Sequence, residues 1–309
     1  MANMATLKEL TKKEARFTCG HRMCPGCGAP IIFRQILLAV DEPVVVGVAT
    51  GCLEVSTTIF PFTSWNTPYI HNAFENAAST ISGAETAYRA FVKKGKIKDK
   101  IHFMAVGGDG ASYDIGFQMI SGAFERGHDM VYVCYDNGAY MNTGIQRSSA
   151  TPYCADTTTS PVGRLVPGKV QKRKDLTKIF AAHNIPYVAQ ASPSHWKDLM
   201  DKARKAFDVE GPAFLNVISP CTLGWRCDQS ETIALAKEAV SSCFWPLYEV
   251  ENGKYRITYK PREKTPVADW LKKQGRFAHL FKPGNEHLLE EIQAQIDMEW
   301  EQLQKLAEL

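Results

Sequence analysis

The sequence predicts an α/β protein built around a doubly wound, mostly parallel β-sheet. Five apolar runs have the length of buried parallel strands and lie at residues 43–50, 101–106, 130–135, 187–192 and 213–219. Between them, apolar residues recur at helical spacing in the segments 76–95, 115–127, 174–184 and 194–208. Strands that alternate with helices are typical of βαβ units, in which successive strands run parallel. We therefore expect one sheet with helices on both of its faces.

The C-terminal part of the chain departs from this alternation. From about residue 228 we expect a short helix, a strand-like run at 253–260 and a proline-rich, charged segment at 260–274. Residues 285–309 have apolar positions at helical spacing among many acidic ones, which predicts an amphipathic helix. That helix either packs on its own domain or contacts another subunit.

Composition excludes several classes of protein. The chain has 309 residues, of which 45% are hydrophobic and 22% charged, as is ordinary for a globular protein. Its net charge of +3 is too small to predict nucleic-acid binding. We expect the basic runs at 93–100 and 169–174 to lie on solvated helix ends or loops, unless they dock an acidic partner or an anionic cofactor.

The location of the protein also follows from the sequence. No segment approaches the roughly 20 apolar residues of a membrane span, and the N-terminus lacks the apolar core of a secretion signal. We therefore expect a cytoplasmic protein that does not contact the membrane. In a reducing compartment its nine cysteines are poor candidates for disulfides, so suitably spaced ones indicate a metal or redox site.

Four turns with chemically useful residues follow predicted strands. They are Gly51-Cys52, Gly108-Asp109-Gly110, Asp136-Asn137-Gly138 and Pro220-Cys221. In doubly wound sheets, ligands bind where the carboxyl ends of the strands meet. We therefore expect these four turns to share one edge of the sheet.

The second and third of these turns predict a diphosphate site with a divalent metal. Small residues allow close backbone approach, and the helix that follows supplies N–H groups to an anion. Asp109, Asn137 and the carbonyl of Ala139 are the oxygen ligands that Mg²⁺ prefers. A lone GDG is often only a turn, whereas GDG, a spacer at 111–135 and then DNG together resemble the thiamine diphosphate fingerprint.

Further residues of these turns complete the predicted cofactor site. We take Asn142 and Cys52 as candidate catalytic residues, because Asn142 could point to the reacting carbon of the cofactor. Phosphate-binding loops of the GxxxxGK[ST] kind and the GxGxxG dinucleotide motif are both missing from the sequence. The candidate cofactor-binding residues are Gly51, Cys52, Gly108, Asp109, Gly110, Ala111, Asn137, Ala139, Asn142 and Thr143.

Cys24 and Cys27 form a CxxC turn that places two thiolates where a metal can bridge them. A tetrahedral or cubane site needs two more ligands, and single cysteines at 52 and 221 follow strand ends on the predicted edge. Zinc and a redox dithiol are the alternatives to iron and sulfur, although zinc ribbons usually supply a second CxxC. Cys227 competes with Cys221 for the fourth position; the other cysteines are expected to be ordinary thiols.

With both sites in view, the chain resembles the thiamine diphosphate-binding β subunit of the pyruvate and 2-oxoacid:ferredoxin oxidoreductases. The likeness covers about residues 16–245 and rests on GHRMCPGCG, TGC, GDGASYDIGF, DNGAYMNTGIQRSSATP and SPCTLGW, in that order. The resemblance implies a 4Fe-4S cluster on Cys24, Cys27, Cys52 and Cys221, and Mg²⁺ on Asp109, Asn137 and Ala139. Related chains often have PCPTGW where this one has CTLGW followed by Arg226 and Cys227, so Cys227 stays the alternative to Cys221.

The resemblance also implies a reaction and partners. The family decarboxylates a 2-oxoacid oxidatively and passes the electrons to ferredoxin, usually with coenzyme A as acyl acceptor. Pyruvate is the default substrate; branched 2-oxoacids, 2-oxoglutarate and oxalate are handled by similar subunits. The glutamate that activates the aminopyrimidine ring is expected on a partner subunit, and another subunit is expected to carry further clusters. Glu54 and Glu75 of this chain are expected to have structural roles.

Two other functions fit the same residues. The chain could be a non-redox thiamine diphosphate decarboxylase or carboligase subunit with structural zinc, or an iron–sulfur electron carrier without enzymatic activity. We divide it into an N-terminal arm with the CxxC ligands (1–40), the cofactor-binding α/β domain (41–245) and a C-terminal extension for packing or subunit contact (246–309).

Overall fold

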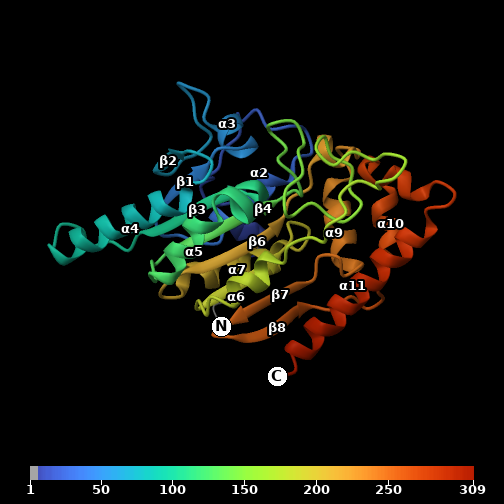
Figure 1. The fold of residues 1–309 in the computed structure, drawn as a ribbon. Helices are drawn as coiled ribbons and strands as arrows, with labels where there is room; N and C mark the ends of the chain where they lie inside the picture. The colour runs from blue at the N-terminus through green and yellow to red at the C-terminus, as the bar shows by residue number, and fades with distance from the viewer. Residues whose placement is uncertain (1–5) are drawn as a thin grey trace.

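The computed structural model describes residues 6–309, so residues 1–5 of the expected arm lie outside the described part. One eight-stranded sheet crosses the molecule in the order β2-β1-β3-β4-β6-β5-β7-β8 (Figure 1). The first six strands in this order run parallel, and β7 and β8 join antiparallel. The strands are β1 Val44–Ala49, β2 Tyr69–Asn72, β3 His102–Gly108, β4 Val131–Asp136, β5 Tyr187–Ala191, β6 Ala213–Ile218, β7 Leu247–Glu251 and β8 Lys254–Tyr259.

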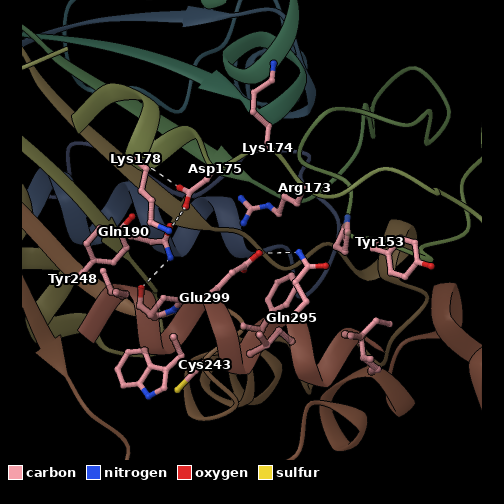
Figure 2. A pocket seen from close by; sticks show the side chains of 18 residues that line it. Tyr153, Arg173, Lys174, Asp175, Lys178, Gln190, Cys243, Tyr248, Gln295 and Glu299 are labelled. Carbon is pink, nitrogen blue, oxygen red and sulfur yellow. Dashed lines mark hydrogen bonds and ion pairs between the residues drawn. The ribbon is translucent and has the colours of Figure 1, made fainter. Parts of the chain in front are cut away.

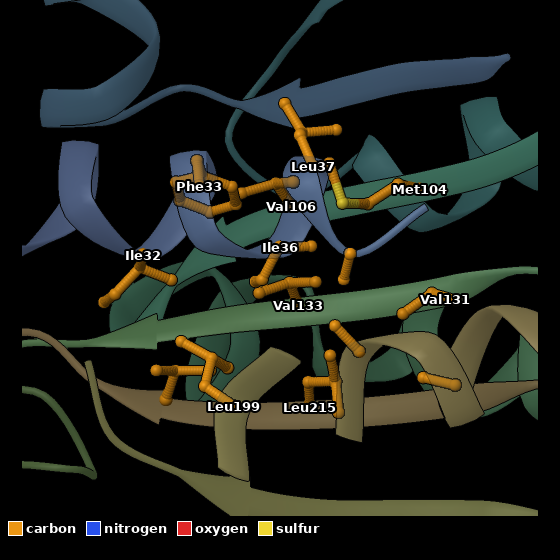
Figure 3. Packing of buried hydrophobic residues seen from close by; sticks show 14 of the residues in the cluster. Ile32, Phe33, Ile36, Leu37, Met104, Val106, Val131, Val133, Leu199 and Leu215 are labelled. Atoms are coloured by element: carbon orange, nitrogen blue, oxygen red, sulfur yellow. The ribbon is translucent and has the colours of Figure 1, made fainter. Parts of the chain in front are cut away.

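Helices cover both faces of the sheet. On one face, α2 (Gly28–Leu38) and α7 (Trp196–Asp208) pack on the strands, and Figure 3 shows Phe33 and Ile36 of α2 against the β3 and β4 side chains. On the other face lie α4 (Ala77–Lys93), α5 (Phe117–Glu125) and α6 (Leu176–Ala181). Along β4, Val131 and Val133 face the first layer and Tyr132 and Cys134 the second. The predicted doubly wound, mostly parallel fold is thus confirmed.

The remaining elements gather at the sheet edge and in the C-terminal part. Around the edge lie α3 (Cys52–Thr57), the π-helix η1 (Gly110–Ile115) and α8 (Thr222–Trp225), and α1 (Leu7–Leu10) begins the described chain. The C-terminal part comprises α9 (Thr232–Ser241), α10 (Val267–Lys272), the 3₁₀ helix η2 (Gly275–Phe281) and α11 (Glu286–Leu306). Their buried side chains form a third core, which includes Trp225 and Trp270. This core connects the C-terminal elements to the sheet edge.

The strands and the longer helices expected from the sequence occur where they were placed. Strands β2 and β7, which have short or mixed sequences, were not predicted. Helix α2, which lies in the expected N-terminal arm, was not predicted either. Because β7 and β8 extend the sheet beyond residue 245, the division of the chain into three parts stays a prediction.

The two basic runs behave differently. The lysines of 93–100 are exposed at the end of α4, as expected. The run 169–174 lies in a loop and Lys172 is exposed, but the prediction was wrong for two of its residues, because Lys169 is 1% exposed and the Arg173 side chain is 19% exposed. Both side chains find oxygen partners inside the protein, which local sequence pattern does not reveal. Among residues 6–309, none of the helices is both long and apolar enough to span a bilayer.

Candidate functional site

The four predicted turns meet along one edge of the sheet. Strands β1, β3, β4 and β6 are consecutive neighbours in the sheet order. Their carboxyl ends are also in register, with Gly108 beside Tyr135 and Asp136 beside Ile218. The turns that carry Cys52, Asp109, Asn137 and Cys221 therefore follow four adjacent strands, and the expectation of a shared edge is confirmed.

A pocket of about 210 Å³ opens at this edge. Nine of the ten residues predicted to bind the cofactor line it; the exception is Ala111, which is buried in η1. Sequence reasoning missed the other lining residues, which carry no motif of their own. These are Thr50, Ala73, Phe74, Tyr135, Tyr140 and Met141.

Glycines keep the pocket open because aromatic rings stand behind them. A Cβ on Gly110 would lie 2.5 Å from a ring carbon of Tyr140, and a Cβ on Gly51 would lie 2.9 Å from the Tyr135 hydroxyl. Real Cβ atoms are not found at such distances from ring atoms. Any larger residue at these two positions would therefore displace the pocket wall.

Three oxygen atoms converge at one side of the pocket. The Asn137 side-chain oxygen lies 2.9 Å from Asp109 Oδ1 and 2.9 Å from the Ala139 carbonyl oxygen. Without a cation, the amide satisfies these contacts by turning its nitrogen toward both oxygens. With a cation, its oxygen joins them as a third ligand.

Asp109 is held as a buried carboxylate. It is 1% exposed, and both burial and the neighbouring charge of Asp136 raise its pKa well above the usual range. Ser148 Oγ donates to one carboxylate oxygen of Asp109, and the Asn137 backbone N–H donates to the other. A bound cation would remove the cost of keeping this carboxylate ionised.

The negative charge of Asp136 is already neutralised by Arg173, which lies beneath the pocket. Arg173 and the Tyr113 hydroxyl both donate to Asp136 Oδ2. Asn216 in turn donates to the Tyr113 oxygen at 2.9 Å. The buried basic run therefore supports the strand end beneath the pocket and does not line the pocket.

Supporting residues hold the Asn137-Gly138-Ala139 turn. The Thr151 hydroxyl donates to the Gly138 carbonyl at 2.7 Å, and the Trp225 indole N–H donates to the Asn137 carbonyl at 2.7 Å. The side chain of Lys169 donates to the carbonyls of Ser149 and Thr151 and so fixes the supporting loop. Sequence reasoning gave Thr151 and Trp225 no role, although they lie in the motifs DNGAYMNTGIQRSSATP and SPCTLGW, and it placed Lys169 in a solvated basic run.

The CxxC turn docks on the loop after β6. The Gly28 N–H donates to the Pro220 carbonyl at 3.0 Å, and the Thr222 hydroxyl donates to the Pro25 carbonyl at 3.4 Å. Gly28 permits this contact, since a Cβ there would lie 2.7 Å from the Pro220 ring. Cys27 is the residue immediately before α2, and the turn brings it to the same region as Cys221.

Four cysteines influence one another across these loops. Burial and, to a smaller extent, the neighbouring thiols of Cys221, Cys52 and Cys24 together raise the pKa of Cys27 to about 12. Cys52 likewise has a raised pKa of about 12 through burial, with contributions from Cys221 and Cys24. The only thiol among the main influences on Cys227 is that of Cys221. The first four cysteines thus form one group, and Cys227 lies at its margin.

This group does not have the geometry of a small metal site or a reactive dithiol. Among residues 6–309, no three His, Cys, Asp or Glu side chains come close enough together for a single metal ion. A reactive CxxC pair needs a lowered thiol pKa, whereas burial raises that of Cys27. The other predicted ordinary thiols behave as expected: Cys134, Cys154 and Cys243 are buried and free, and Cys19 is exposed.

The pocket and the cysteine group share a wall. Cys52 belongs to both, and Met141 of the pocket lies against α8 beyond Cys221. The ideal Cβ position of Gly224 lies 2.1 Å from Met141 Sδ and 3.5 Å from Cys221 Sγ. The sulfur atoms of Met141 and Cys221 are therefore no farther apart than the sum of these two distances.

Glu54 and Glu75 do not line the pocket. Glu54 is 3% exposed, and its Oε1 lies 2.5 Å from His71 Nδ1 and 3.1 Å from the Thr58 hydroxyl. Glu75 is half-buried, and its carbonyl lies near Gly116. Neither carboxylate is placed to replace one from a partner subunit.

A second cavity of about 100 Å³ lies between α11 and the sheet, away from all the predicted site residues (Figure 2). Its charged and amide groups pair with one another: Lys178 lies 3.1 Å from Asp175, and Gln295 donates to Glu299 at 2.8 Å. Nothing in this lining indicates a ligand. The candidate functional site is therefore the pocket at the carboxyl ends of the strands.

The fold and the pocket together define a thiamine pyrophosphate-binding α/β domain, and a comparison with protein families agrees. The family described as the C-terminal TPP-binding domain of thiamine pyrophosphate enzymes matches residues 49–217. The solved 2-oxoglutarate:ferredoxin oxidoreductase from Magnetococcus marinus matches with a TM-score of 0.56. That match covers 87% of this chain and 95% of the other at 19% identity, so it supports the fold alone.

Curated relatives define the family more closely. Pyruvate synthase subunit PorB of Thermotoga maritima is 52% identical over 98% of this chain and 95% of its own. PorB of Methanocaldococcus jannaschii is 52% identical over 92% and 95%, and ketoisovalerate oxidoreductase subunit VorB of Pyrococcus abyssi is 41% identical over 96% and 94%. The chain belongs to the PorB family, the β subunits of the pyruvate and related 2-oxoacid:ferredoxin oxidoreductases. It is thus an oxidoreductase subunit.

Proposed function

We propose that this chain is the subunit that binds thiamine diphosphate, Mg²⁺ and a 4Fe-4S cluster in a pyruvate:ferredoxin oxidoreductase. One observation carries the proposal: Cys52 lines the pocket that contains Asp109 and Asn137, and it also belongs to the group of four cysteines. A cofactor in the pocket and a cluster on the cysteines would therefore be neighbours. When bound, the cofactor supplies carbanion chemistry at the 2-oxo carbon and the cluster accepts single electrons.

The oxygen geometry supports Mg²⁺ in particular. Mg²⁺ takes octahedral oxygen ligands at 2.0–2.1 Å, so two adjacent ligands at a right angle are about 2.9 Å apart. The Asn137 side-chain oxygen is 2.9 Å from both Asp109 Oδ1 and the Ala139 carbonyl. These three oxygens would occupy adjacent corners and leave the other positions for diphosphate oxygens and water.

The pocket residues have separate roles in this proposal. Gly108 and Gly110 admit the diphosphate next to the backbone, where η1 begins. Asn142 and Thr143 are exposed at the pocket mouth, where they would contact the substrate or the reacting part of the cofactor. Tyr135 and Phe74 form walls that exclude water from the pocket.

The cysteine pattern favours a cluster over structural zinc. A zinc ribbon usually supplies a second CxxC, whereas Cys24 and Cys27 are here joined by single cysteines at 52 and 221. A cubane binds each cysteine through a different iron atom. The thiols of Cys24, Cys52 and Cys221 all influence that of Cys27 electrostatically, so the four lie in one region. Cys221 is the better fourth ligand, because Cys227 lies at the margin of the group.

The substrate is proposed from the relatives. PorB relatives are named for pyruvate synthase and VorB for ketoisovalerate oxidoreductase, so pyruvate is the first candidate and a branched 2-oxoacid the second. None of these names supports oxalate. We further propose that ferredoxin accepts the electrons, that coenzyme A accepts the acyl group, and that a partner subunit supplies the glutamate for the aminopyrimidine ring. We place this complex in the cytoplasm.

The proposal is tested in the purified complex with Asp109→Ala. We expect loss of bound thiamine diphosphate with unchanged iron and sulfide, because the carboxylate serves Mg²⁺ alone. Asp129→Ala is the matched control: Asp129 precedes the opposite end of β4, and burial raises its pKa as well. Cofactor retained in the Asp109 variant would contradict the magnesium assignment.

Metal analysis and the cysteine variants test the cluster. About four irons and four sulfides at this subunit support it, whereas one zinc without sulfide would support a non-redox thiamine enzyme. Cys221→Ser should lower the iron content more than Cys227→Ser, and equal iron in both variants would refute the choice of Cys221. Ferredoxin reduction with pyruvate, 3-methyl-2-oxobutanoate, 2-oxoglutarate and oxalate then identifies the substrate.

A further inference from the structure

Arg276 is a buried cation that lacks a carboxylate partner. It belongs to η2 and is 3% exposed. Its Nε donates to Gln274 Oε1 at 3.0 Å, and its guanidinium carbon lies 4.5 Å from the centre of the Trp225 ring. Within residues 6–309, it forms no ion pair with Asp or Glu. A cation removed from water without a counter-ion is strongly unfavourable, so this residue requires an explanation.

The guanidinium of Arg276 lies close both to the diphosphate turn and to the cysteine loop. One of its terminal nitrogens lies 3.1 Å from the ideal Cβ position of Gly138, in the turn that carries the proposed magnesium ligands. On its other side, Trp225 ends the short helix that begins after Cys221. Arg276 therefore lies between the diphosphate turn and the cysteine loop, although it comes from the C-terminal part of the chain.

The groups around Arg276 indicate which negative charge it faces. Burial lowers the pKa of Arg276 to about 9, and the neighbours that oppose this shift are, in order, Cys221, Cys227, Asp136 and Asp109. A guanidinium stays protonated in proteins, so the lowered pKa reflects the cost of burying the charge. Asp136 is already paired with Arg173, and Asp109 accepts from Ser148. The negative charge that would balance Arg276 is therefore missing on the side of Cys221 and Cys227.

Solvent does not neutralise the positive charge of Arg276. The cavity that Arg276, Gly138 and Trp225 help to line has a volume of about 10 Å³. That is about the room that one water molecule needs. One water would accept a hydrogen bond from the guanidinium but would not neutralise its charge.

We propose that Arg276 is the counter-charge of the cysteine-ligated site, where it raises the reduction potential of a cluster bound through Cys221. The inference rests on the proposed function, since it needs the cluster. One-electron reduction adds one negative charge to a cluster that thiolates already make negative, and a fixed cation in a water-poor site stabilises the reduced form more. Arg276 thereby makes the first electron transfer out of the pocket more favourable. It acts through charge and does not touch the substrate.

The experiment compares Arg276→Met with Arg276→Lys in the purified complex. The two replacements are unbranched and similar in length, and only lysine carries the charge. Reduction potentials are measured by titration monitored with electron paramagnetic resonance, and iron and sulfide are counted in each sample. Any clusters on other subunits serve as internal references. Arg226→Met is the control, because Arg226 also adjoins Cys227 but is half-exposed and paired with Asp156 at 2.6 Å.

We expect Arg276→Met to disfavour reduction about tenfold, a shift of about 59 mV to more negative potential. Arg276→Lys and Arg226→Met should remain near the unmodified complex. Loss of the cluster in Arg276→Met but not in Arg276→Lys would also support the proposal, since only charge separates the two. Unchanged potentials with full iron, or equal cluster loss in both variants, would overturn it. An unmodified complex without an iron–sulfur signal at this subunit would instead refute the proposed function.

Discussion

Removal of one buried hydroxyl should weaken magnesium-dependent cofactor binding without removing any ligand. Ser148 is 1% exposed, and its Oγ donates to Asp109 Oδ2. A hydrogen bond to a charged group contributes about 1.5–3 kcal/mol, and every 1.4 kcal/mol is tenfold in an equilibrium constant. Groups that orient metal ligands typically account for about 10- to 100-fold in metal affinity. We therefore expect Ser148→Ala to raise the Mg²⁺ concentration for half-maximal cofactor retention about 10- to 100-fold.

The assay counts thiamine diphosphate that stays with the purified complex after gel filtration over a range of Mg²⁺ concentrations. Full occupancy should be recovered at high Mg²⁺, because Asp109 and Asn137 remain. Ser149→Ala is the matched control: Ser149 is the next residue, and within residues 6–309 its hydrogen bonds use only its backbone groups. A half-saturating Mg²⁺ concentration within twofold of the unmodified complex would show that the hydroxyl does not hold a metal ligand.

Three further predictions follow from the contacts around the pocket. Gly224→Ala would place a Cβ 2.1 Å from the sulfur of Met141, so cofactor retention should fall, whereas Gly83→Ala, with open space on α4, should leave it unchanged. Trp225→Phe removes the donor to the Asn137 carbonyl and keeps an aromatic ring; we expect the Mg²⁺ concentration for half-maximal cofactor retention to rise about tenfold in the same assay. Burial lowers the pKa of Lys169 to about 8, against about 10.4 in an unfolded chain, so the folded state binds fewer protons in that window. In urea unfolding of the chain, its stability relative to Lys169→Met should rise by up to about 3 kcal/mol from pH 8 to pH 10.4, and a flat difference would contradict this.

The fold was readable from the sequence because its strands are buried on both faces. Such strands are continuous apolar runs, and they alternate with helices whose apolar spacing is unambiguous. β2 escaped prediction because only four residues pair at the sheet edge, and β7 because charged residues alternate with apolar ones in a late segment. Lys169 was misplaced because its partners are backbone carbonyls of a loop about 20 residues away, which no local pattern encodes.

The site residues were predictable where a side chain that can bind a metal or a cofactor also lies just after a strand. Asp109, Asn137, Cys52 and Cys221 lie within three residues of strand ends, so the rule that carboxyl ends of parallel strands share an edge was enough to bring them together. The sequence did not reveal the strand order that makes those strands neighbours. It also did not reveal the supporting residues, such as Ser148, because a serine in a loop has no distinguishing pattern until its partner is known.

The two proposed centres are mechanically connected through the loop after β6. That loop carries Cys221 at its start and Trp225 at its end, and the Trp225 indole N–H reaches the Asn137 carbonyl beside the proposed magnesium ligands. Displacing the loop from the cysteine side should therefore move the oxygen side as well. Because residues that share such a contact do not act independently, the effects of Cys221→Ser and Ser148→Ala on the Mg²⁺ concentration for half-maximal cofactor retention should fail to add. Strict additivity in the double variant would mean that the pocket and the cysteine loop are adjacent without being coupled.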